Sequence, residues 1–281
     1  QISVAADMLL RAGLARLDCR PSCRGLSSVP RIGELRTVRQ VVDAHAQHRK
    51  QYRPIDLGAS WNMLGKLVRQ QSEKQVLRAT PQMLQSLAQH TEQALPKFDA
   101  RPLANTVNGL ASLHASRGWR ASDALWTGLA TQCTGCVPKM KAQHLANTVH
   151  GFAKVARREP ALLDAIAEQA AGRGLRDFDE QALANTAWAY ATAGHAAPAL
   201  LDAIAEEAAR RGLREFNRQD LANTAWAYAV ADHPAPALFG GDAFGQRCAA
   251  ERGFVPKNLC QLHQWQLWQE ERGAAWPPLP P

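Results

Sequence analysis

The chain has 281 residues, of which 46% are hydrophobic and 21% are charged, and its formal net charge is +8. This balance excludes a wholly disordered chain, and no apolar run approaches the roughly 20 residues that a membrane-spanning helix needs. The six cysteines are too few and too scattered for a disulfide-stapled secreted scaffold, which indicates a reducing compartment.

The positive charge is concentrated in the first two thirds of the chain. Residues 1–180 carry 25 basic and 15 acidic side chains, a balance of +10, whereas residues 181–281 carry 8 and 10, a balance of −2. We therefore expect the first part to face a polyanion such as a nucleic acid.

Residues 1–30 form a basic segment that bears serines and few carboxylates. Its arginines are Arg11, Arg16, Arg20 and Arg24, and its acidic residues are Asp7 and Asp18. This composition is typical of transit segments for import into an organelle. The alternative is a basic surface extension that packs on a partner.

Residues 31–54 contain apolar positions at helical spacing, among them Ile32, Leu35 and Val38. We predict an N-terminal capping helix from Ile32 to Lys50. It would cover the first end of the repeats that follow, because a stack of repeats otherwise exposes an apolar face there.

Residues 55–270 contain a repeated motif. Leu183–Tyr190 and Leu221–Tyr228 both read LANTAWAY and begin 38 residues apart. Related octets begin at Leu103 and Leu145, and weaker copies begin at Leu57 and Leu259. A period of this length is the signature of a solenoid. We predict an all-α fold, an α-solenoid of about six stacked helix-turn-helix repeats of ~38 residues.

Each unit is predicted to be a pair of helices, and the fourth shows the signals best. Asp179 is a good N-cap for the first helix, and Gly194 ends it. Pro198 begins the second helix, which Gly212 ends, and Gly174 is expected to end the preceding unit in the same way. The frequent alanines of the first helix should form the packing seams between units.

Residues 271–281 form a Pro-rich tail, ending in Pro277-Pro-Leu-Pro-Pro281, which is predicted to be extended. We expect it to cap the last unit; the alternative is that it binds a partner.

The repeated sequence carries a family likeness. The pattern Phe-x4-Leu-Ala-Asn-Thr-Ala-Trp-Ala-Tyr-Ala, at 178–191 and 216–229, resembles the octotricopeptide and heptatricopeptide repeats of organellar proteins in algae and alveolate protists. Residues 254–268 are similar to the segment that leads into the C-terminal domain of proteins with FAST-kinase-like and RAP modules. The resemblance covers about residues 50–270 and implies an α-solenoid that acts on organellar RNA. The first and last copies lack Asn-Thr and no RAP module follows, so a binding or structural role is expected rather than RNA cleavage.

The Asn-Thr pair recurs early in each predicted first helix, although both are poor helix formers. One explanation is that each asparagine amide reads a nucleobase. The other, which the identity of the pair in the four units that carry it favours, is that it ties neighbouring hairpins together by a backbone hydrogen bond. The residue three positions later varies, which suits base contact. Candidate base contacts are Asn105, Asn108, Asn147, His150, Asn185 and Asn223. For His150 a core role is equally open, and Trp188 and Trp226 are interpreted as core residues.

Cations recur in the turns between units and at the ends of helices, where they should form a stripe along one edge that suits a sugar–phosphate backbone. The alternative is that they compensate helix dipoles, which does not account for Arg157 and Arg158. Candidate phosphate contacts are Lys97, Arg101, Lys139, Lys141, Lys154, Arg157, Arg158, Arg173, Arg176, Arg210, Arg211 and Arg214.

The cysteines have suggestive spacings. Cys133 and Cys136 could form half a zinc site or a redox pair, and Cys19 and Cys23 another half. Nothing in the sequence places the two halves together, so we interpret them as free cysteines and predict no metal.

The sequence offers little for catalysis, because it has no Gly-rich phosphate loop, His-Glu-x2-His or Gly-x-Ser-x-Gly motif. The carboxylates that share a helix face, Asp164 with Glu168 and Asp202 with Glu206, are interpreted as surface charge.

The sequence and the resemblance together predict a non-catalytic RNA-binding helical-repeat protein that needs no cofactor. It would be a structural component of a mitochondrial ribosome or other ribonucleoprotein, with organellar RNA and other subunits as partners and the plastid as the alternative location. The competing hypothesis is a protein–protein scaffold subunit of a large organellar complex, with the same architecture.

Overall fold

The computed structural model describes residues 29–273, and within them every regular element is a helix. The helices pack against one another around one continuous core. The all-α class predicted from the sequence is therefore confirmed. Most of the predicted basic extension (1–30) and of the Pro-rich tail (271–281) lies outside the described residues.

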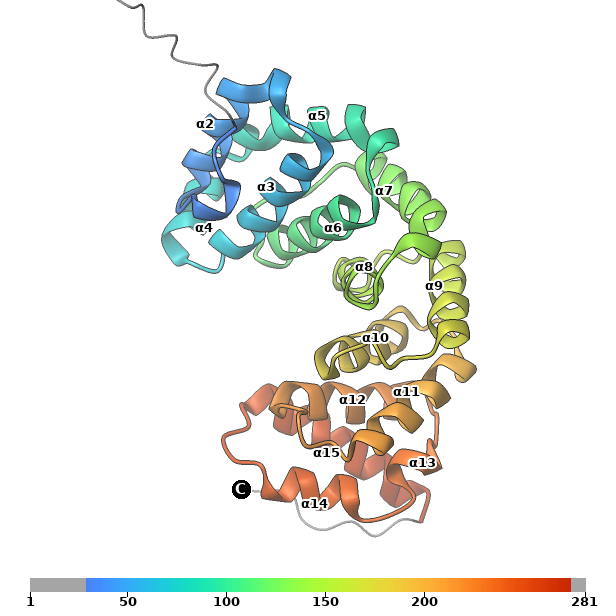
Figure 1. The fold of residues 1–281 in the computed structure, drawn as a ribbon. Coiled ribbons are helices and arrows are strands. Elements are labelled where there is room, and N and C mark those ends of the chain that lie inside the picture. Colours follow the sequence, from blue (N-terminus) through green and yellow to red (C-terminus); the bar gives the residue numbers. More distant parts are fainter. Residues whose placement is uncertain (1–28, 274–281) are drawn as a thin grey trace, which may run out of the picture.

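The helices form two rows along an arc, and the inner row contains the repeated octets (Figure 1). Each inner-row helix packs against the next one along the chain. The inner row comprises α3 (Pro54–Leu67), α6 (Ala100–Ala115), α8 (Ala142–Lys154), α10 (Glu180–Ala193), α12 (Arg218–Val230) and α15 (Pro256–Glu271).

The outer row lies on the convex side and is made of the second helices. Three of these are single helices: α7 (Asp123–Cys136), α9 (Pro160–Arg173) and α11 (Pro198–Arg211). At the two ends of the row the second helix is broken, near Pro81 and at Gly240-Gly241, so the prediction of one second helix per unit is wrong there. The broken elements are α4 (Gln71–Ala79), η3 (Pro81–Leu84) and α5 (Gln85–Ala94) at the first end, and α13 (Pro236–Phe239) and α14 (Ala243–Ala250) at the other.

A shorter helix than predicted precedes the rows. α2 (Val38–His48) begins at Val38 because the Thr37 hydroxyl accepts a hydrogen bond from the backbone N–H of Gln40, which marks an N-cap. Single 3-10 turns flank it, and it packs against α3, α4 and α5. The remaining 3-10 turns are η1 (Ile32–Glu34), η2 (Arg49–Gln51), η4 (Leu95–Lys97) and η5 (Val137–Lys139).

Small residues let the inner-row helices approach closely. A Cβ on Gly109 of α6 would lie 2.1 Å from the carbonyl oxygen of Trp61 on α3, and a Cβ on Gly151 of α8 would lie 2.5 Å from Val107 on α6. The equivalent Ala189 and Ala227 are completely buried. Neighbouring inner helices therefore touch at the seventh residue of the octet, as we predicted from the small residues of these helices.

Hydrogen bonds that repeat along the chain join successive helix pairs. The Tyr190 and Tyr228 hydroxyls donate to the carbonyl oxygens of Leu163 and Leu201, at 2.7 and 2.6 Å. Imidazoles just after the inner helices contact carboxylates of the preceding outer helix, each at 2.8 Å: His195 with Asp164, and His233 with Asp202. The two aspartates are exposed, as expected of surface charge, but each also links two helix pairs.

The predicted caps of the fourth unit are present. Asp179 accepts from the backbone N–H of Ala182, Gly194 and Gly212 adopt left-handed conformations, and Pro198 is the first residue of α11. Gly174 differs, since its φ of 77° is combined with an extended ψ of 164°. The expectation that α9 and α11 end in the same way is therefore wrong.

The residue after the inner helix is left-handed in four successive pairs, but only one of these residues is glycine. The φ angles are 56° at Arg117, 56° at Ala156, 60° at Gly194 and 48° at Asp232. A residue with a Cβ is strained in this region, so three of the four turns carry a cost that glycine would remove.

We expect Ala156→Gly to raise the free energy of unfolding by about 0.5–1 kcal/mol, because relief of backbone strain exceeds the entropy that glycine adds to the unfolded chain. Gly194→Ala is the matched control and should lower it by a similar amount. A Cβ there would meet only Arg158, at 3.6 Å, so a clash would not account for the loss. Denaturant unfolding of both variants checks this; shifts of the same sign would contradict the backbone explanation.

Candidate nucleic-acid interface

The inner-row helices leave one face half-exposed toward the hollow of the arc. Neighbouring inner helices cover two sides of each helix and the outer row covers a third. The residues left half-exposed are the third, sixth and tenth, counted with the first leucine of the octet as residue one. These half-exposed residues are Asn105, Asn108 and Ser112 on α6; Asn147, His150 and Lys154 on α8; and Asn185, Trp188 and Thr192 on α10.

The side chains of the middle position contact one another along the row. The Asn108 amide donates to Asn62 Oδ1 at 3.3 Å. The ring centroids of His150 and Trp188 are 5.2 Å apart, and those of Trp188 and Trp226 are 6.2 Å apart. Both tryptophans pack on the core with one part exposed, so their interpretation as core residues holds only in part. The row offers amide, imidazole and indole faces, which can stack on or hydrogen-bond to single-stranded bases.

The recurrent asparagines do not tie the helix pairs through backbone bonds. The amides of Asn105, Asn147 and Asn185 are half-exposed, and the structure shows no backbone hydrogen bond to them. Asn223 is buried, and its Oδ1 accepts instead from the Gln219 and Gln261 side chains at 2.7 and 3.1 Å. Base contact by the three half-exposed amides remains a prediction. The side-chain oxygen of Asn223 is already hydrogen-bonded within the protein.

His150 is neutral near pH 7. Burial and repulsion from Lys154 and Lys257 lower its pKa to about 4. It therefore contributes a ring face and hydrogen-bonding nitrogens, and no charge, to the inner face.

Cations from distant parts of the chain converge on this face. The pKa of Lys154 is lowered by burial and by repulsion from Arg69 and Lys257, which lie at the end of α3 and the start of α15. None of the three forms an ion pair with a carboxylate in the described part of the chain. The curvature of the arc thus gathers unneutralised positive charge.

A pocket of about 350 Å³ opens beside this charge, and we call it the basic pocket. Arg69, Lys74 and Lys154 line it, together with the polar side chains of Gln71, Ser112 and Ser116. Lys154 was predicted to contact phosphate, whereas Arg69 and Lys74 were missed. Both residues follow the degenerate first octet, and the turn after that octet could not be aligned with the turns of the other units.

The predicted phosphate contacts divide into two groups. The charged ends of the first group form no hydrogen bond or ion pair with other described residues, and all of its members except Lys154 are exposed: Lys97, Arg101, Lys139, Lys141, Lys154, Arg158, Arg176 and Arg214. Arg101 and Lys141 both repel the His144 imidazole and so, with its burial, lower its pKa. Cations of successive turns therefore do lie side by side on this edge.

The second group is bound within the protein. Arg157 pairs with Asp123 at 2.7 Å, and Arg173 donates to the carbonyl oxygen of Met140 at 2.6 Å. Arg211 pairs with Glu180 and Glu207 and donates to the backbone of the preceding turn, and Arg210 also pairs with Glu207. These guanidinium groups are held by carboxylates and carbonyls of the protein itself, which competes with phosphate contact.

The edge also loses positive charge toward the C-terminal end. Asp177, Asp179, Glu180 and Glu215 stand among the cations of its later turns. Burial and repulsion from Asp179 and Glu180 raise the pKa of the buried Asp220 carboxyl to about 6. A continuous phosphate path along this edge is therefore favoured only in its first half.

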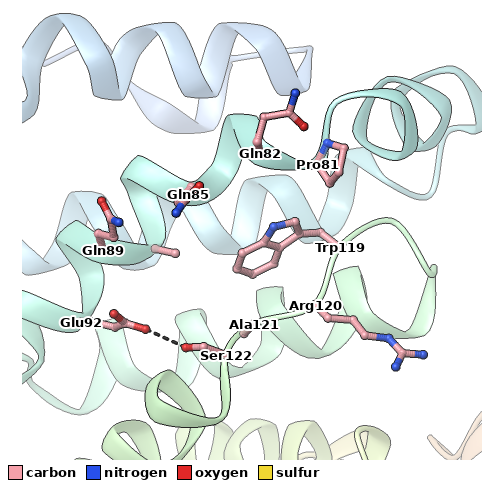
Figure 2. Close-up of a pocket in the computed structure, with 10 residues that line it drawn as sticks. Pro81, Gln82, Gln85, Gln89, Glu92, Trp119, Arg120, Ala121 and Ser122 are labelled. Atoms are coloured by element: carbon pink, nitrogen blue, oxygen red, sulfur yellow. Dashed lines mark hydrogen bonds between the residues drawn. The ribbon is translucent and has the colours of Figure 1, made fainter.

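Another pocket, of about 480 Å³, lies elsewhere (Figure 2). Trp119 stands at its centre beside Gln85, and Arg120 points away from it. Glu92 accepts from the Ser122 hydroxyl at 2.7 Å on its rim. A carboxylate and an indole do not suit a phosphate, so this pocket, which the sequence did not indicate, is not part of the proposed RNA path.

The two cysteines that the structure describes near each other do not form a metal site. Cys133 is buried, which raises its thiol pKa, and the Cys136 thiol lies 3.8 Å from the carbonyl oxygen of Phe98. Within residues 29–273, no three His, Cys, Asp or Glu side chains are grouped to hold a metal. Cys19 and Cys23 lie outside the described residues.

No protein-family model matches the chain, and a search of curated proteins found no match. The likeness to organellar repeat proteins therefore rests on the quoted residues alone. Between residues 29 and 273 no helix is long and apolar enough to cross a membrane.

We expect Arg211→Gln to lower the free energy of unfolding by about 2 kcal/mol, because it leaves partly buried carboxylates and backbone carbonyls without their charged partner. Arg214→Gln, three residues along in the same turn, is the control and should change it by less than about 0.5 kcal/mol. Thermal and denaturant unfolding measure both. Equal effects would show that the Arg211 links do not stabilise the fold.

We expect stability to fall as the pH is lowered from 6.5 toward 4, because the unfolded chain then protonates His150 while the folded chain does not. The contribution of His150 to the free energy of unfolding is fully present above pH 6.5. His150→Gln should make this decline shallower without removing it, since the pKa of His45 is also lowered to about 4. Denaturant unfolding across this pH range measures the slope; an unchanged slope would contradict the assignment.

Proposed function

We propose that the protein is an α-solenoid of six helix-turn-helix repeats that binds single-stranded RNA along the inner face of its arc, without chemically changing the RNA. The observation that carries the proposal is the pairing of stackable side chains with unneutralised cations on one concave face. His150, Trp188 and Trp226 supply the rings, and Lys154 and Lys257 lie beside them.

The chemistry of this face favours a polynucleotide over a polypeptide. Single-stranded RNA is bound by aromatic faces for its bases and by cations for its backbone, and both are present together here. The named half-exposed residues include no carboxylate. A peptide ligand would instead need apolar pockets or backbone partners, and the inner face presents amide and ring edges.

The proposed path differs from the edge predicted from the sequence. The inner face gathers Arg69, Lys154 and Lys257 near one another, whereas the edge acquires carboxylates at its later turns. We therefore place the bases on the inner row and let the free edge cations, such as Lys139 and Arg176, contribute long-range attraction.

The alternative function is a protein–protein scaffold of the same architecture. The pocket around Trp119 favours it, because a half-exposed indole with amide neighbours suits a partner's side chain (Figure 2). The two functions can coexist in a structural subunit of a ribonucleoprotein, which is the role that we propose. The mitochondrion, or alternatively a plastid, is proposed from residues 1–30 and the family likeness.

We expect the purified chain to bind labelled single-stranded RNA with an affinity that falls steeply with salt, by a slope of about −0.7 per contacted phosphate. Trp188→Leu should weaken binding about tenfold through lost stacking, and Lys257→Gln should reduce the slope by about 0.7. Fluorescence anisotropy from 50 to 300 mM salt, roughly the range over which such contacts screen, measures both.

The edge variants Lys139→Gln and Arg176→Gln are matched controls for charge, and they should change the affinity less than Lys257→Gln. A larger effect of the edge variants would move the RNA path to the edge. No retention of RNA at low salt would overturn the proposed function and favour the scaffold.

A further inference from the structure

The basic pocket gathers three cations from separate elements. Arg69 follows α3, Lys74 lies on α4, and Lys154 is the last residue of α8. The hydroxyls of Ser112 and Ser116 line the same space. Both hydroxyls donate to backbone carbonyls, of Asn108 and Leu113, so the donors left for a ligand are the three cationic side chains. The pocket is thus a concave site lined by three cations from separate elements, and not a strip of surface lysines.

The charge in this pocket exceeds what the fold itself requires. The carboxyl ends of α3, α6 and α8 meet nearby, and each helix end is equivalent to about −0.5 charge. Three such ends amount to about −1.5 against three unit positive charges, so about +1.5 remains. None of the three cations has a carboxylate partner within 4.0 Å among residues 29–273.

Lys154 has the strongest need for an anion. Its side chain is more than half buried, and burial together with Arg69 and Lys257 lowers the pKa of its ammonium group. A charged group held in such a place is stabilised by an opposite charge within hydrogen-bond reach. The described residues supply no carboxylate partner, so a bound anion would stabilise this charge.

The surplus matches one kind of phosphate better than another. A phosphodiester inside an RNA strand carries one negative charge, whereas a terminal phosphate monoester carries about −1.5 to −2 at pH 7 and three acceptor oxygens. The pocket adjoins the inner row at Ser112 and Lys154. A strand that lies along the row can therefore end in it.

We infer that the basic pocket binds the terminal phosphate monoester of the RNA strand and so fixes the strand by its end. This inference rests on the proposed function, because it assigns the end of the same ligand. The phosphate can belong to the 5′ or the 3′ end, and the two sources share the chemistry that the pocket recognises.

The test compares RNAs of one sequence that carry a 5′-hydroxyl, a 5′-phosphate or a 3′-phosphate, with fluorescence anisotropy as the readout. One phosphorylated form should bind about tenfold more tightly than the 5′-hydroxyl form. The double variant Arg69→Gln/Lys74→Gln should lose this gain and bind all three RNAs with similar affinity. Its melting temperature should stay unchanged, because neither side chain forms a hydrogen bond or ion pair with another described residue.

Lys139→Gln is the control and should keep the full gain. Inorganic phosphate, titrated by calorimetry, should bind to the wild type and not to the double variant. If all three RNAs bind equally and phosphate does not bind, the inference is overturned while the proposed function stands. If none of the RNAs binds at low salt, the proposed function fails and this inference fails with it.

Discussion

The close approach of neighbouring inner helices is the constraint on which the rest of the structure depends. It requires a residue without a large side chain at Gly109, Gly151, Ala189 and Ala227. Helices that touch at this position bury their flanks against each other and their backs against the outer row. On α6, α8 and α10 the third, sixth and tenth residues, counted from the first leucine of the octet, remain half-exposed, so the seam also decides which side chains can meet a ligand.

The regular part of the fold could be predicted because its causes are local. The octets, the Asp179 cap and the glycines of the fourth unit determine helix ends through neighbouring residues, and the structure reproduces them. The ends of the chain depart because α4–α5 and α13–α14 are broken at proline and glycine positions. The octet before α4–α5 is also a degenerate copy, so the period did not align that unit with the others.

The site was harder to predict, because the fate of each cation depends on neighbours one unit away. Arg211 and Arg214 stand in the same turn, yet Arg211 reaches Glu180 and the carbonyl oxygens of the turn before α10, more than 30 residues earlier, while Arg214 stays exposed. Sequence spacing cannot separate them. Arg69 and Lys257 are likewise almost 190 residues apart and come together near Lys154 only through the curvature of the arc.

An end-anchored strand would also account for the two classes of inner-face residue. The third octet position is the same Asn in four helices, so it cannot distinguish one base from another along the strand. The sixth varies from Asn108 to His150 to Trp188. If one end of the strand is fixed, each varied side chain meets the base at a set distance from that end. The fixed end then determines which base meets which side chain. Only the side chain at the varied sixth position has to select a base.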